Sequence, residues 1–149
     1  MAKTLNVLVV EDAPNYSRLA RAQLELWKQK GGSNGFDDYA VQIEKLPEQV
    51  LGMITDEIHL VVLDMELDDG SGGYDGVTDV LVPARKKGYQ GAVLGWTGAR
   101  HERFRNYQKR ATDAGADGFV SKDQAAKEGV FIQEVNSALE NATKRLNSK

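Results

Sequence analysis

Several polar residues that could act together each follow an apolar run of the chain. They are Glu11, Asp12, Asp64, Thr97 and Lys122. Three carboxylates that meet would repel one another strongly at low dielectric, and a hard divalent cation such as Mg²⁺ removes that cost. A hydroxyl and an ammonium at the same place offer two contacts for a phosphoryl group. These residue types therefore predict a Mg²⁺-assisted phosphoryl site with a carboxylate nucleophile.

The apolar runs themselves are typical of strands in a parallel sheet. Leu5–Val10, Leu60–Leu63 and Ala92–Leu94 lack polar alternation, which favours strands buried on both faces. Tyr39–Ile43 and Gly118–Val120 are shorter strand signals. Because the carboxyl ends of parallel strands lie at one edge of a sheet, we expect the polar residues to meet there.

Five helical segments alternate with these strands. They begin near Pro14 and Pro47, cover Val77–Ala84 and 100–114, and run from about Gln124 to Leu146. Pro83 lies inside the third segment and predicts a kink or an early end there. Five strand–helix repeats predict one α/β domain over residues 1–149, with a core of about 4–146 and a doubly wound parallel sheet.

Composition excludes several classes of protein. The 149 residues are 41% hydrophobic and 28% charged, which is typical of a globular chain, and the absence of cysteine excludes disulfides and thiolate chemistry. A net charge of −3 argues against general binding to nucleic acid. No apolar stretch is long enough for a signal peptide or a membrane span, so we expect a soluble, cytoplasmic protein.

Four motifs at the predicted strand ends carry a resemblance to a known family. They are Val9-Val10-Glu11-Asp12, Val62-Leu63-Asp64, Trp96-Thr97-Gly98 and Phe119-Val120-Ser121-Lys122. In this order they make nearly the whole chain resemble the receiver domain of two-component response regulators. The resemblance implies a flavodoxin-like (βα)5 fold with strand order 2-1-3-4-5.

The resemblance also implies a phosphoacceptor and its metal site. Asp64 matches the aspartate that accepts a phosphoryl group from the phosphohistidine of a sensor histidine kinase or a histidine phosphotransfer protein. Glu11 and Asp12 match the acidic pair that holds Mg²⁺ together with Asp64. Glu66 matches the position whose main-chain carbonyl completes the metal ligands. Such a receiver promotes only its own phosphorylation and dephosphorylation, so we do not expect an enzyme acting on another substrate.

Further matching positions imply a conformational switch. Thr97 and Lys122 match the hydroxyl and the ammonium that contact the phosphoryl oxygens, and Gly98 matches the small residue that leaves room for them. Phe119 matches the aromatic residue whose rotamer reports the state of the domain. Signalling would then be a population shift at the surface of the fourth helix, fifth strand and fifth helix, which would contact a downstream protein. Because the chain ends with the last predicted helix, we expect a stand-alone receiver without an output domain.

The sequence departs from the family pattern in three places. Asp123 stands where the family often has a proline, frequently with a cis bond. Asp68–Gly73 looks like an insertion after the phosphoacceptor. Glu66 and Ala99 occupy variable positions that, in this family, tune autodephosphorylation.

Two alternative functions stay open at this point. A phosphatase of the haloacid dehalogenase type also uses an aspartate nucleophile, but it places that residue after the first strand and a second aspartate two residues later, where this chain has Glu66. A receiver-like binding module would act without phosphorylation.

The basic stretch from Arg100 to Arg110 is typical of a solvated helix face or of a surface that binds a partner. No helix-turn-helix follows it that would favour binding to DNA. We expect Trp96, next to Thr97, to be partly buried.

Overall fold

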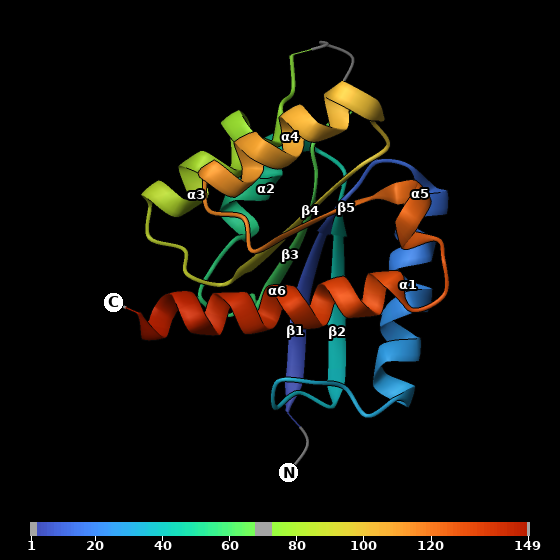
Figure 1. The fold of residues 1–149 in the computed structure, drawn as a ribbon. Coiled ribbons are helices and arrows are strands. Elements are labelled where there is room, and N and C mark those ends of the chain that lie inside the picture. The colour runs from blue at the N-terminus through green and yellow to red at the C-terminus, as the bar shows by residue number, and fades with distance from the viewer. Residues whose placement is uncertain (1–2, 68–72, 149) are drawn as a thin grey trace.

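A central parallel sheet organises the protein, whose structure, a computed structural model, describes residues 3–67 and 73–148 (Figure 1). Within these ranges the sheet has five strands in the order β2-β1-β3-β4-β5. The strands are β1 (Thr4–Val10), β2 (Asp38–Glu44), β3 (Leu60–Asp64), β4 (Ala92–Thr97) and β5 (Gly118–Ser121). The predicted fold class and strand order are confirmed.

Helices cover both faces of the sheet (Figure 1). One face packs against α1 (Pro14–Gln29) and α6 (Val130–Asn147). The other packs against α2 (Pro47–Met53), a widened turn η1 (Val77–Leu81), α3 (Val82–Lys86) and α4 (His101–Asp113). A short helix, α5 (Lys122–Ala125), follows β5. No helix in the described ranges is long and apolar enough to cross a lipid bilayer.

The strand side chains alternate between two separate apolar clusters. In β1, Val7 and Val9 point to the side of α1 and α6, whereas Leu8 and Val10 point to the side of α2 and α3. All four are at most 1% exposed. A strand buried on both faces has no polar alternation, which explains the continuous apolar runs in the sequence.

The irregularity predicted at Pro83 takes the form of a widened helical turn. The backbone N–H of Val82 bonds to the carbonyl of Val77, five residues earlier rather than four. In a regular helix the proline ring would meet the carbonyl four residues before it. The wider turn accommodates the ring, and the helix continues to Lys86.

The prediction of one continuous helix from about Gln124 to Leu146 was wrong. Gly129 has a φ of 77°, a left-handed conformation that favours glycine and separates α5 from α6. The hydroxyl of Ser121 accepts a hydrogen bond from the backbone N–H of Gln124 and starts α5. Lys122 is therefore the first residue of a helix. Of the insertion predicted at Asp68–Gly73, residues 68–72 lie outside the described residues.

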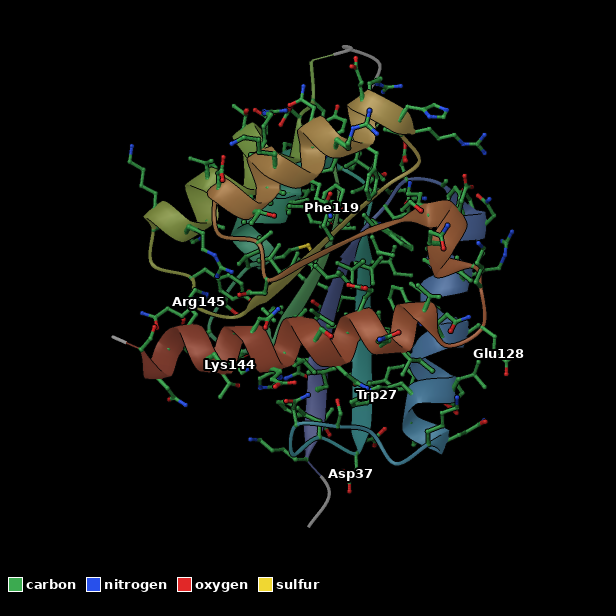
Figure 2. The ribbon with its side chains drawn as sticks, in the orientation of Figure 1. Trp27, Asp37, Phe119, Glu128, Lys144 and Arg145 are labelled. Carbon is green, nitrogen blue, oxygen red and sulfur yellow. The ribbon has the colours of Figure 1, made fainter. Side chains whose placement is uncertain are left out.

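A buried carboxylate ties the elements together at the amino edge of the sheet. Asp117, just before β5, accepts hydrogen bonds from Arg85 at 2.9 Å, Arg145 at 3.1 Å and the backbone N–H of Val93 at 3.0 Å. Figure 2 shows Arg145 near the C-terminal end of α6. The two guanidinium groups also donate to the carbonyl of Gly91. This network fixes α3 and α6 against the starts of β4 and β5.

Candidate functional site

Three predicted metal ligands meet at the carboxyl edge of the sheet. A carboxylate oxygen from each of Glu11, Asp12 and Asp64 lies within 4.8 Å of the others. The sheet brings them together because Val10 of β1 pairs with Leu63 of β3, so the acids follow neighbouring strands at the same level. Glu11 and Asp64 are each 1% exposed, and Asp12 is half-buried.

The ammonium of Lys122 joins this cluster. Its Nζ lies 2.6 Å from Oε1 of Glu11 and 3.0 Å from Oδ2 of Asp64. The lysine is itself buried, with 6% of its surface exposed. Three carboxylates against one ammonium leave an excess of negative charge when all are ionised. That donor set fits a hard divalent cation, which prefers carboxylate oxygens.

Burial and like charge act together on Asp64. Burial, followed by the charge of Glu11, raises the pKa of its carboxyl from 3.8 to about 7. The Lys122 ammonium and the backbone N–H of Glu66 work in the opposite direction. Burial disfavours the ammonium of Lys122, but the charges of Asp64 and Glu11 outweigh it and raise the pKa of this lysine. Near neutral pH, the Asp64 carboxyl can therefore gain or lose its proton when a nearby charge changes.

Two aromatic rings flank Lys122 on the side of α1 and α6. Its Nζ lies 4.5 Å from the ring centroid of Tyr16 and 5.5 Å from that of Trp96. The expectation that Trp96 is partly buried was wrong: it is 0% exposed, because β4 lies beneath α6 and Phe131 packs 5.9 Å from the indole. Sequence reasoning missed Tyr16, since a tyrosine in the first turns of a helix is an ordinary packing residue.

Thr97 and Gly98 lie at the same edge of the sheet. Thr97 is fully buried, and its Oγ1 accepts a hydrogen bond from the backbone N–H of Ala99 at 3.0 Å. The hydroxyl thus makes a local turn bond here, and its predicted contact with a phosphoryl group stays a prediction. At Gly98 an added Cβ would meet only Cδ of Lys122, at 4.0 Å, which leaves open space between Gly98 and the stem of this lysine.

The segment after β3 contacts Asp64 through its backbone and through one tyrosine. The N–H of Glu66 donates to Oδ1 of Asp64 at 3.0 Å, while the Glu66 side chain pairs with Arg103 of α4. Further along, the hydroxyl of Tyr74 donates to the main-chain oxygen of Asp64 at 2.8 Å. The predicted metal contact of the Glu66 carbonyl stays a prediction.

Phe119 lies apart from the acids, on the other face of the sheet. Figure 2 shows it between the sheet and α4, where its ring is 5.2 Å from that of Phe104. It is half-buried. Its predicted switching between rotamers stays a prediction. Asp123, at the position where the family often has proline, pairs with Arg100 at 2.9 Å, and the described part of the chain has no cis peptide bond.

Comparisons with known proteins show which solved structures have a similar fold. No protein-family model and no curated protein sequence matches the chain. The structure is similar to the CheY-like receiver domain protein from Methanospirillum hungatei JF-1, with 20% identity, a TM-score of 0.67 and coverage of 96% of this chain and 99% of that one.

Two further solved structures also have a similar fold. A receiver domain protein from Clostridium thermocellum has 22% identity and a TM-score of 0.66, over 97% of this chain and 98% of that one. A response regulator from Burkholderia pseudomallei with a phosphorylated aspartic acid has 19% identity and a TM-score of 0.62, over 97% of this chain and 72% of that one. The chain therefore has the fold of a CheY-like response regulator receiver domain.

Proposed function

We propose that this protein is a response regulator receiver that accepts a phosphoryl group on Asp64 in a Mg²⁺-dependent reaction. One observation carries the proposal: Asp64 lies with Glu11, Asp12 and the ammonium of Lys122 in one cluster at the carboxyl edge of the sheet, and all but Asp12 are buried. A purely structural ion pair needs one acid and one base, whereas this cluster holds three acids. The excess of acids is what a site for a divalent cation requires, and the cation together with the Lys122 ammonium would offset the charge of a phosphoryl group.

The chemistry is a transfer of the phosphoryl group between two side chains. A carboxylate oxygen of Asp64 attacks the phosphorus of a donor phosphohistidine, the new O–P bond forms, and the P–N bond to the imidazole breaks. The electron pair of that bond stays on the imidazole, which takes a proton from solvent. The Lys122 ammonium, already at Asp64, offsets the charge on the phosphoryl oxygens, and the Thr97 hydroxyl can donate to one of them.

A divalent cation would be held by Glu11, Asp12 and Asp64, with the main-chain carbonyl of Glu66 as a further ligand. When bound, it supplies positive charge that favours the ionised carboxylate of Asp64 and offsets phosphoryl charge. In this structure Glu11 has Oε1 on the Lys122 ammonium and Oε2 on the backbone N–H of Ala13, so a bound cation would compete with both contacts. We therefore expect the ammonium to exchange its contact with Glu11 for the phosphoryl oxygens while it stays beside Asp64.

The partners follow from the same proposal. The donor is a sensor histidine kinase or a histidine phosphotransfer protein, and the output is contact with a downstream protein through α4, β5 and the helices after it. Two ion pairs support α4 as the responding element: Arg103 with Glu66, and Arg110 with Asp75 at 2.8 Å. Both join α4 to the segment that follows Asp64. A response regulator with this fold carries a phosphorylated aspartic acid in the Burkholderia pseudomallei structure.

Intact-mass spectrometry tests the proposal. The protein is incubated with acetyl phosphate and Mg²⁺, with a Mg²⁺-free sample and the Asp64→Asn variant in parallel. We expect a mass increase of one phosphoryl group that requires both Mg²⁺ and Asp64. The control variant Asp56→Asn, which changes an exposed acid at the other edge of the sheet, should show the same increase as the wild type. No increment on the wild-type protein would overturn the proposal in favour of a binding module that acts without phosphorylation.

A further inference from the structure

Two kinds of group contact the ammonium of Lys122, carboxylates and aromatic rings. Two carboxylates contact its ammonium at one end of the site, and the rings of Tyr16 and Trp96 contact it from the side of α1 and β4. We propose that Tyr16 and Trp96 are positioning residues, which hold the Lys122 ammonium at Asp64 through cation–π contacts. This inference deepens the proposed function and rests on it.

The two rings form a corner around the ammonium. Their centroids are 6.1 Å apart and their planes meet at 73°, so the edge of one ring faces the other. The Lys122 Nζ lies within the 6 Å over which a ring attracts a cation, for both rings. Trp96 is fully buried and Lys122 nearly so, and a cation–π contact is strongest where water is excluded.

The indole of Trp96 is present despite an energetic cost. Its Nε1–H is buried and finds no acceptor among the residues that the structure describes. A buried donor without a partner costs about 1–3 kcal/mol, and a phenylalanine would fill much of the same space without that cost. Indole is also the ring that attracts a cation most strongly. The attraction between the indole ring and the Lys122 ammonium therefore explains a tryptophan at this position better than packing alone does.

The ring contacts matter because the carboxylates are needed elsewhere. Asp64 and Glu11 hold the ammonium in this structure, yet the proposed function assigns them to the phosphoryl group and the metal. Lysine carries a point charge on a flexible four-carbon stem, so without the rings its position before phosphoryl transfer would depend on these carboxylates alone. The rings do not change partners during the reaction. They keep the ammonium close to Asp64 while the carboxylates engage other groups.

A pair of matched substitutions at Tyr16 tests this role. Tyr16→Phe keeps the ring, whereas Tyr16→Met keeps a side chain of similar length and apolar character without a ring face. The rate of phosphorylation by acetyl phosphate with Mg²⁺ is measured by intact mass. We expect Tyr16→Phe to retain most of the rate and Tyr16→Met to lose roughly tenfold. Tyr39→Met, on β2 and away from the site, is the control for removal of a tyrosine ring.

A second readout does not depend on phosphorylation. The Nζ of Lys122 lies over two rings, so the NMR signals of the adjoining Cε protons should be shifted upfield in the wild-type protein and in Tyr16→Phe, and less so in Tyr16→Met. Thermal unfolding of each variant confirms that it folds. Equal rates and equal shifts for Tyr16→Phe and Tyr16→Met would overturn the positioning role. If the wild-type protein shows the upfield shift but takes up no phosphoryl group, the proposed function is overturned, and with it the role of the two rings in phosphorylation.

Discussion

The ammonium of Lys122 donates a hydrogen bond to Oδ2 of Asp64 over 3.0 Å, although 58 positions separate the two residues in the chain. The same ammonium contacts Glu11, so one cation offsets the charge of two buried carboxylates. Removing one partner of a buried ion pair leaves the other charge without compensation, which costs far more than the loss of an exposed pair.

Replacing Lys122 should therefore destabilise the metal-free protein. Lys122→Met keeps the apolar stem and removes the charge, and we expect a loss of about 3 kcal/mol in the free energy of unfolding at pH 8. Urea unfolding measures it. Lys109→Met removes an exposed lysine that pairs with Asp113 and should change little. Equal stability of Lys122→Met and the wild type would show that the pair contributes nothing.

The raised pKa of Asp64 predicts a specific dependence of stability on pH. Since this carboxyl binds its proton more tightly in the folded protein than in the unfolded chain, its ionisation destabilises the metal-free fold as pH rises from about 4 through 7. Asp64→Asn should thus stabilise the protein at pH 8, and this gain should shrink as pH falls toward 4. Thermal unfolding of the two proteins across pH measures the difference. A gain that grows at low pH would contradict the assignment.

Mg²⁺ should stabilise the protein through the three acids. A ligand that binds only the folded state raises its stability by mass action, so we expect millimolar Mg²⁺ to raise the Tm by roughly 2–5 °C. Asp12→Asn should abolish most of this increase, because Asp12 is one of the three acids in the cluster. Asp56→Asn is the matched control and should respond as the wild type does. The same increase in both variants would place the metal elsewhere.

Gly76 should be essential for the close approach of its segment to Asp64. A Cβ atom at Gly76 would lie 2.5 Å from the main-chain oxygen of Asp64 and 2.9 Å from the Cα of Met65. Gly76→Ala should cost about 1–3 kcal/mol of stability, since the backbone beside Asp64 must shift, and it should slow the phosphorylation proposed at Asp64. Gly52→Ala is the control: nothing lies within 4 Å there, and alanine favours helix α2 by about 0.5–1 kcal/mol.

Asp117 should matter for stability and not for phosphorylation. Asp117→Ala leaves Arg85 and Arg145 without their shared carboxylate, and we expect a loss of about 3 kcal/mol in unfolding free energy. The rate of phosphorylation at a temperature where the variant is folded should stay at the wild-type value. Asp113→Ala removes a nearby exposed acid and should alter neither quantity. A slower reaction in Asp117→Ala would mean that the two edges of the sheet are coupled.

Much of this architecture could be predicted from the sequence because a parallel sheet imposes simple rules. Apolar runs such as Leu60–Leu63 identify buried strands, and the residue after each run lies at the carboxyl edge. That reasoning brings Glu11 and Asp64 together without knowledge of any distance. It also places Lys122 at the same edge.

Other features depend on three-dimensional packing that local patterns do not contain. The break between α5 and α6 depends on one left-handed glycine, Gly129, within a sequence that otherwise has helical spacing. The burial of Trp96 depends on which helix crosses β4, and the contact of Tyr16 with Lys122 depends on how α1 and α5 approach each other. Sequence spacing says which residues share an edge, but not which rings surround a given charge.

The separation of the arginine network from the acidic cluster has a consequence for protein engineering. The network of Arg85, Asp117 and Arg145 secures the starts of β4 and β5. Thr97 and Lys122 lie at the opposite ends of these two strands, and the acids lie at the same edge, at the ends of β1 and β3. Substitutions that increase thermal tolerance can therefore be sought around the network without touching the reactive end. The usual conflict between robustness and activity is reduced in this chain, because the two requirements fall on different residues.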